Sequence, residues 1–189
     1  GRCVAPVVPQ RYGIDPARAP PMYHEALAVI MKACESDLLN FEGKFYNFKD
    51  YLVQSKPLQR PHPPVWYGAR DPENVGWAAP NSVNVVSLGP AARARAITDR
   101  YRKDWAELGR NATDIPMMGI TRHIVVAPTD AEAKQMARPA YAMWREAIEM
   151  LWARSGVNFP LTPVYPRSFD ELEAIGHGIA GSPATLRDY

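Results

Sequence analysis

The stretch VWYGARDPEN, residues 65–74, decides the fold class. Its first half is an unbroken run of apolar and small residues, which is typical of a strand buried on both faces. Its second half begins like a helix, because Asp71 is a favoured N-cap residue and Pro72 fits the first helical position. We therefore predict a strand over 65–69, a tight turn, and a helix that extends to about Ala79.

The same alternation continues toward the C-terminus. The further predicted elements are strands at 82–86 and 117–127 and helices at 90–108 and 130–154. Thr129 and Glu132 form a capping box that starts the long helix, and Pro139 predicts a kink or a break within it. Strands that alternate with helices indicate parallel βα units. No glycine-rich dinucleotide fingerprint follows a strand, which favours a barrel over a Rossmann sheet.

The helix at 90–108 has two distinct faces and ends at Gly109. We expect its apolar positions to face inward: Ala94, Ile97, Tyr101, Trp105 and Leu108. The opposite face carries basic residues, with acidic residues interspersed: Arg93, Arg95, Arg100, Arg102 and Lys103. Mixed charges of this kind indicate a solvated surface rather than a binding patch.

The two ends of the chain are less regular. Apolar residues at helical spacing predict a helix at 21–36, and the turn-like triplet at 42–44 predicts a short hairpin. The prolines of 57–64 favour an extended approach to the strand at 65–69. Residues 155–176 are expected to be a polar connection, and the Ser182-Pro183 pair is typical of a helix start, with Ser182 as its N-cap.

Composition limits the class of protein. The chain has 189 residues, 47% of them hydrophobic and 22% charged, with a net charge of +2. These values indicate a globular protein that binds no nucleic acid, and no apolar run is long enough to cross a membrane. The two cysteines, Cys3 and Cys34, suggest no disulfide framework, so we expect a cytoplasmic protein. The four histidines lack metal-ligand spacing, so no metal site is predicted.

The strand-to-helix turn from Ala69 to Asn74 is the main candidate site. Active sites of parallel α/β folds lie at the carboxyl ends of the strands, and a helix N-terminus there favours a phosphate. Arg70 adds a cation and Asn74 a donor, whereas the carboxylates of Asp71 and Glu73 would repel an anion. The alternative is structural, with Asp71 capping the helix and Arg70 pairing with Glu73.

Four motifs carry a resemblance to a known family. They are FEGKFYNF from Phe41, KPLQRPHPPVWYGARDPENVGWAA from Lys56, HIVVAPTDAEA from His123, and the terminal GSPATLRDY. Together they closely resemble the luciferase-like flavin-dependent monooxygenases, in the family's order and along the whole chain. The resemblance implies a single domain, 1–189, that is part of a (β/α)₈ barrel. It further implies that the chain begins at the end of the fourth strand, lacks the N-terminal strands, and stops before the last strand.

The resemblance also implies a cofactor and its site. The family uses reduced flavin, here FMN, and O₂ to oxygenate a small organic substrate, with NAD(P)H acting indirectly through a flavin reductase. The residues that match its phosphate site are Arg2, Ala69, Arg70, Asp71 and Asn74. This chain departs from the family pattern at Cys3, the third residue of a Gly-Arg-Gly turn. It also departs at the charged pair Arg70-Asp71, where the family has small hydroxyl residues.

Two further residues are candidates at the active site. Some family members use a histidine on the strand that here contains His123, so His123 is a predicted acid–base residue; the alternative is a histidine hydrogen-bonded within the barrel wall. Strand alternation places His123 with Thr121 and Val125 on one face. Ser87 follows the preceding strand and is a predicted substrate contact, with a plain loop as the alternative.

Two other functions remain open at this point. One is hydride transfer with the deazaflavin F420, without oxygen insertion. The other is a flavin-binding protein or dimer partner that has lost catalysis. The resemblance further implies a homo-oligomer at full length. Because a partial barrel leaves strand edges unpaired, we expect the isolated 189 residues to aggregate readily and to be inactive.

Overall fold

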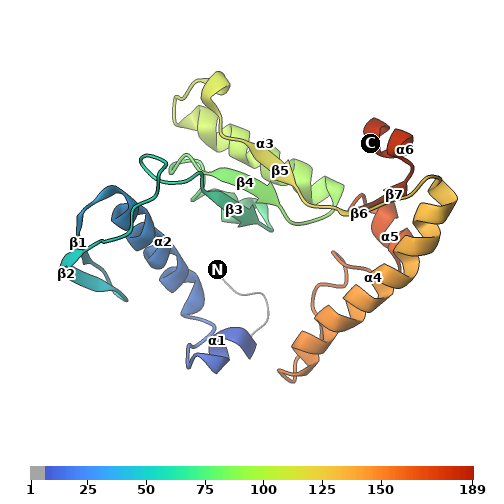
Figure 1. Ribbon diagram of the computed structural model, residues 1–189, viewed down its shortest axis with the longest axis horizontal. Coiled ribbons are helices and arrows are strands. Elements are labelled where there is room, and N and C mark those ends of the chain that lie inside the picture. The colour runs from blue at the N-terminus through green and yellow to red at the C-terminus, as the bar shows by residue number, and fades with distance from the viewer. Residues whose placement is uncertain (1–6) are drawn as a thin grey trace. The chain divides into compact units, whose positions relative to one another are not determined.

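The computed structural model describes residues 7–189, so Arg2 and Cys3 lie outside the described residues. The chain divides into two compact units (Figure 1). One contains residues 7–64 together with Leu151–Val157, and the other contains Val65–Met150 together with Asn158–Tyr189. The candidate residues at 69–74, 87 and 123 all belong to the second unit.

The first unit is built from helices and a hairpin. Its elements are α1 (Val7–Arg11), α2 (Ala19–Glu35), β1 (Leu38–Glu42) and β2 (Asn47–Leu52). The two strands pair antiparallel, which confirms the hairpin, and α2 confirms the helix predicted at 21–36. The carboxylate of Glu25 accepts the backbone N–H groups of Lys44, Phe45 and Tyr46 at 2.7–3.1 Å. A single side chain of α2 therefore fixes the hairpin turn.

The second unit contains two groups of parallel strands. β3 (Trp66–Ala69), β4 (Asn84–Ser87) and β5 (Met118–Ile120) form one sheet, with Ala69 beside Ser87 and Ser87 beside Ile120. β6 (His123–Val126) pairs with β7 (Gly178–Gly181). The parallel βα arrangement predicted from the sequence is confirmed, and the described residues close no barrel.

The strand predicted at 117–127 is two strands with a break at Thr121 and Arg122. The backbone N–H and the hydroxyl of Thr121 both donate to the carbonyl of Ser87, at 3.0 and 3.1 Å. The guanidinium of Arg122 donates to the carbonyls of Thr121 and Gly89. These bonds take the place of ladder pairing, so the chain leaves the partner β4 and then pairs with β7.

Long helices accompany these strands. α3 (Ala91–Glu107) buries Ala94, Ile97, Tyr101 and Trp105 as predicted, but Leu108 lies beyond the helix end and is 46% exposed. Gly109 ends the helix with φ near +69°, a conformation that costs glycine least. α4 (Asp130–Ala153) starts at the predicted Thr129–Glu132 capping box and continues through Pro139 without dividing.

The helix predicted from Asp71 to about Ala79 is wrong. The segment forms a single 3₁₀ turn, η1 (Pro72–Val75), followed by further turns, with backbone bonds such as Ala78 N–H to Val75 C=O at 2.7 Å. Val75, Ala78 and Ala79 are all fully buried. The segment is thus buried in the core, and β4 begins only a few residues later, which leaves no length for a regular helix. A second 3₁₀ turn, η2 (Ala112–Asp114), follows α3.

The connection predicted at 155–176 is also partly wrong. It contains α5 (Phe169–Ala174), which begins with a reciprocal capping box between Ser168 and Glu171. β7 was not predicted either, because the sequence GIAG offers no bulky strand-forming side chain. α5 packs directly on β7: a Cβ at Gly178 would lie 2.9 Å from Leu172. A core cluster joins these elements to α4: Ala127, Ala133, Ala137, Tyr141, Phe169, Leu172 and Ala180. The last helix is α6 (Pro183–Asp188).

Candidate functional site

The carboxyl ends of β3 and β4 lie side by side, so that three candidate residues come together. Ala69 pairs with Ser87, and Arg70 directly follows Ala69. The N–H of Leu88 donates to the carbonyl of Ala69 at 3.0 Å, which ties the turn after β4 to the turn after β3. Ala69 is fully buried, whereas Arg70, the next residue, is half-buried. Asn74 lies in η1, where its N–H donates to the carbonyl of Asp71 at 3.1 Å. The segment after β3 is therefore a 3₁₀ turn, and its role in phosphate binding stays a prediction.

Asp71 does not cap η1 with its side chain. Its backbone has the extended conformation of an N-cap, and Pro72 occupies the first helical position as predicted, but no side-chain capping bond forms. The Asp71 carboxylate instead lies 3.8 Å from the guanidinium of Arg93, in the first turn of α3. Arg93, which the sequence indicated as part of a solvated face, is thus a member of the candidate site.

Arg122, at the break between β5 and β6, connects the turn after β4 to the end of the chain. Its guanidinium donates to the carbonyl of Gly89 at 3.1 Å and to the Tyr189 hydroxyl at 3.0 Å. Since Gly89 follows β4 and Tyr189 follows α6, Arg122 links the two groups of strands. Sequence reasoning gave Arg122 no role at the site, and the only local signal was a charged residue inside an apolar strand.

A tilted pair of rings, Tyr165 and His177, lies near the positive charges. The rings of Tyr165 and His177 lie 5.0 Å apart, and the carbonyl of Val164 lies 2.8 Å from Nδ1 of His177. Burial lowers the pKa of His177; the Val164 carbonyl opposes this, and the charges of Arg122 and Arg93 lower it further.

The third arginine, Arg70, acts on Tyr165. Burial raises the pKa of Tyr165, and the charge of Arg70 partly offsets that rise. The charges of three arginines therefore act on these two rings. They are Arg70 in the turn after β3, Arg93 in the first turn of α3 and Arg122 at the break after β5. Among the described ion pairs, one of these arginines, Arg93, pairs with the carboxylate of Asp71. This arrangement suits an anion.

His123 faces the helix side of β6. Its ring makes edge contacts with Trp144, Tyr141, Tyr165 and His177, at centroid distances of 4.5–6.1 Å. The alternation predicted from the sequence is present, since Ile124 on the other face is 56% exposed. Burial lowers the pKa of His123, and the charge of His177 lowers it further. The surroundings of His123 are those of a neutral, packed ring, and its catalytic role stays a prediction.

Ser87 is the most enclosed of the candidates. It is 1% exposed, and its hydroxyl has no hydrogen-bond partner among the described residues. It shares a face of β4 with Val85, which is equally buried. A buried hydroxyl without a partner is uncommon in proteins. The predicted substrate contact at Ser87 therefore remains a prediction, with burial as the main fact that bears on it.

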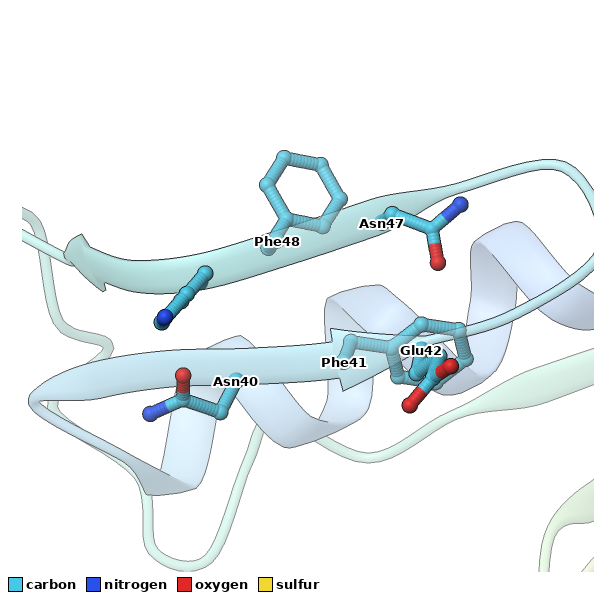
Figure 2. A pocket seen from close by; sticks show the side chains of 6 residues that line it. Asn40, Phe41, Glu42, Asn47 and Phe48 are labelled. Carbon is cyan, nitrogen blue, oxygen red and sulfur yellow. The ribbon is translucent and has the colours of Figure 1, made fainter.

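A hollow lies elsewhere, on the hairpin of the first unit. It encloses about 530 Å³ and is lined from both strands by Asn40, Phe41, Glu42, Asn47, Phe48 and Lys49 (Figure 2). None of the candidate residues lines it. In the part of the chain that the structure describes, no three histidine, cysteine or acidic residues come together as a metal site. Likewise, residues 7–189 include no helix that is long and apolar enough to span a membrane.

Comparison with known proteins identifies the family. The family described as luciferase-like monooxygenase matches residues 1–188. An uncharacterised protein of Sinorhizobium fredii, y4wF, is 30% identical over 187 residues, which are 99% of this chain and 54% of that protein. The chain therefore belongs to the luciferase-like monooxygenase family, which confirms the resemblance seen in the sequence.

Solved structures agree on the fold. The monooxygenase RslO1 from Streptomyces bottropensis matches with a TM-score of 0.78 and 19% identity, over 100% of this chain and 54% of that one. The oxygenating constituent of 3,6-diketocamphane monooxygenase from Pseudomonas putida, solved with FMN, matches with a TM-score of 0.68 and 19% identity. That match covers 100% of this chain and 57% of the other. The chain has the α/β fold of a partial luciferase-like barrel and spans about half the length of these relatives.

Proposed function

We propose that this chain is part of a flavin-dependent monooxygenase that binds FMN at the carboxyl ends of β3 and β4. The observation that carries the proposal is the group of arginines at these strand ends, in a chain of the luciferase-like family. Reduced flavin would supply the electrons with which O₂ oxygenates a small organic substrate. A flavin reductase that uses NAD(P)H is the proposed source of reduced flavin, and self-association belongs to the same proposal.

The residues present fit a phosphate. Guanidinium groups form charge-assisted hydrogen bonds with phosphate oxygens, and Arg70 stands where the family's flavin phosphate turn is matched. Arg122 already donates to Gly89, Thr121 and Tyr189, so its part is to position the turn after β4. Arg2 is proposed as a further phosphate ligand and lies outside the described residues. The carboxylate of Asp71 repels an anion, so the binding of a phosphate depends on the arginines.

The neutral rings behind the arginines have a separate task. His177 is buried and Tyr165 partly buried, and the pKa shifts of both residues favour the uncharged forms. Uncharged rings add no charge that would compete with the anion, and they exclude water from one side of the arginines. Electrostatic attraction is stronger where water is excluded.

Binding of FMN and riboflavin tests the proposal, because the two ligands differ only in the phosphate. The intact wild-type protein that contains this chain is expected to bind FMN more tightly than riboflavin in flavin fluorescence titrations. Arg70→Ala is expected to weaken FMN binding about 10- to 100-fold, the value of a hydrogen bond to a charged group, and to leave riboflavin unchanged. Arg95→Ala, on the exposed face of α3, is the matched control.

The outcomes separate the alternatives. Equal losses for both flavins in Arg70→Ala would show that Arg70 does not contact the phosphate. Oxygen consumption with reduced FMN supports the monooxygenase. Bleaching of F420 instead supports hydride transfer, and tight FMN binding without turnover supports an inactive flavin-binding protein.

The acid–base role of His123 is a separate proposal. A neutral imidazole can accept a proton, and the lowered pKa of His123 keeps it neutral at pH 7. His123→Phe preserves a ring among the four contacting aromatic and histidine rings but removes the base. Loss of turnover at unchanged FMN affinity supports the role. Unchanged turnover would show that His123 is a packing residue.

A further inference from the structure

Arg93 occupies a position that is unfavourable for a cation. It lies in the first turn of α3, a helix of 17 residues, and that turn contains no acidic residue. The N-terminal end of a helix carries a partial positive charge, so acidic groups or bound anions stabilise it and cations do not. The packing of α3 gives no reason for the residue either, because the Arg93 side chain is 38% exposed.

The Arg93 side chain is nevertheless held in one place. It lies across Gly89: a Cβ at position 89 would be 3.1 Å from Cδ of Arg93. A larger residue at position 89 would crowd the Arg93 side chain, so Gly89 gives it room at the end of β4. The same turn is fixed from the other side by Arg122, which donates to the Gly89 carbonyl. The guanidinium of Arg93 is thus directed toward the turn after β3.

Its ion pair with Asp71 is weak enough to be exchanged. The distance of 3.8 Å is too long for a hydrogen bond, and the two side chains are 38% and 48% exposed. Exposed pairs of this kind contribute little to stability. An anion that bonds directly to the guanidinium would replace the Asp71 contact at small cost, because charge-assisted bonds to phosphate are short and strong.

Charge counting then indicates which anion fits. Arg70 directly precedes Asp71 in the sequence, and Arg93 forms an ion pair with Asp71. Two positive charges therefore lie near one negative charge. Arg122 adds a third positive charge close to the same ring pair. A phosphate monoester carries a charge between about −1.5 and −2 at pH 7, whereas a phosphate diester carries a single charge. A doubly charged group compensates this site better than a singly charged group.

We propose that Arg93 is a specificity residue that selects the phosphomonoester of FMN over the phosphodiester of F420. The inference rests on the proposed function, since it assigns a cofactor preference to the same site. Arg93 contacts the second charge of the monoester, and Arg70 contacts the first. Asp71 holds Arg93 near the site before the cofactor binds.

The test compares three ligands on the intact protein that contains this chain: FMN, riboflavin and F420. Equilibrium titrations monitored by ligand fluorescence give the dissociation constants, and circular dichroism checks the fold of each variant. Arg93→Ala is expected to weaken FMN binding about tenfold and F420 binding less than about threefold. Arg93→Lys keeps the charge and is expected to recover most of the FMN affinity. Arg95→Ala is the control for removal of a positive charge from α3.

The possible results separate two failures. If wild-type chain prefers FMN over riboflavin and Arg93→Ala keeps the full preference for FMN over F420, the inference is wrong and the proposed function stands. If FMN and F420 lose equal affinity in Arg93→Ala, Arg93 attracts anions in general and selects neither. If wild-type chain does not distinguish FMN from riboflavin, the proposed phosphate site fails, and the role of Arg93 fails with it.

Discussion

The turn after β3 and the turn after β7 have the same strand-to-helix form but opposite electrostatics. After β7, the Ser182 hydroxyl accepts the Thr185 N–H at 3.3 Å and caps α6 as predicted. The Asp130 carboxylate accepts the Ser182 N–H at 2.6 Å and the Thr185 hydroxyl at 2.8 Å. The carboxylate and the donors around it are thus paired with one another. After β3, Asp71 caps nothing and pairs loosely with Arg93.

This contrast distinguishes a structural turn from a binding turn. Both turns contain a residue that is a favoured helix cap, and the sequence alone does not show which one uses it. At Ser182 the polar groups satisfy one another, so substitution is expected to affect stability. At Arg70 and Asp71 the charged groups are not satisfied by close local bonds among the described residues, so substitution there is expected to affect ligand binding.

The largest effect on stability is expected for Asp130→Ala. It removes the acceptor for the Ser182 N–H and the Thr185 hydroxyl, and a fall of several degrees in Tm follows. Asp71→Ala, the equivalent change at the other turn, is expected to leave Tm unchanged and to raise FMN affinity by removing a negative charge. Thermal unfolding followed by circular dichroism measures both variants. An equal loss of Tm at the two positions would show that both turns are structural.

Asp130 also predicts the direction of a pH effect. The N–H of Ser182 and the hydroxyls of Thr185 and Ser182 lower the pKa of Asp130 below its ordinary 3.8. An acid with a lowered pKa in the folded state stabilises the fold above its unfolded pKa, and this contribution is lost as the pH falls through the folded pKa. In Asp130→Asn, the fall of Tm below about pH 4 is expected to be smaller than in wild type.

A second, intermediate effect is expected from the histidines. Burial lowers the pKa of both His123 and His177 below the ordinary 6.5. The unfolded chain therefore binds more protons, so their contribution is present above about pH 6.5 and is lost as the pH falls through the folded-state pKa. Tm is expected to fall between pH 7.5 and pH 5.5, and less steeply in His123→Phe. An identical slope in that variant would contradict a buried, neutral His123.

The smallest effect is expected for a pair of serine substitutions with opposite signs. Ser87→Ala removes a buried hydroxyl that lacks a partner among the described residues and is expected to stabilise the chain by about 1 kcal/mol. Ser182→Ala removes an N-cap and is expected to cost about 1 kcal/mol. Urea unfolding measures both. A loss of stability in Ser87→Ala would show that the hydroxyl has a bonding partner.

Sequence patterns predicted the parts of the fold that depend on local chemistry. The α3 stripe ending in Trp105, the Thr129 capping box and the Ser182 cap were all confirmed because each is specified within about one or two helical turns. The helix expected after Asp71 became a 3₁₀ turn because burial of Val75 and its neighbours determines that segment. β7 was missed because its glycines and alanine are selected by close packing against α5 rather than by strand propensity.

The candidate site was predicted only in part, for a similar reason. Arg70 and Asp71 stand directly after a strand, so the sequence places them at the strand end. Arg93 and Arg122 reach the same place from a helix start and a strand break, and their spacing in the sequence contains no sign of that meeting. Recognition of such residues requires the register of β3 against β4 and of β4 against β5.

Phosphorus-31 NMR of FMN bound to the chain tests the central claim most directly. The second ionisation of a phosphate monoester has a pKa of about 6, and nearby positive charges favour the doubly charged form. We predict that the phosphate resonance of bound FMN stays that of the dianion well below pH 6, and that Arg70→Ala together with Arg93→Ala restores titration near pH 6. A bound phosphate that titrates like free FMN in the wild-type chain would contradict the account.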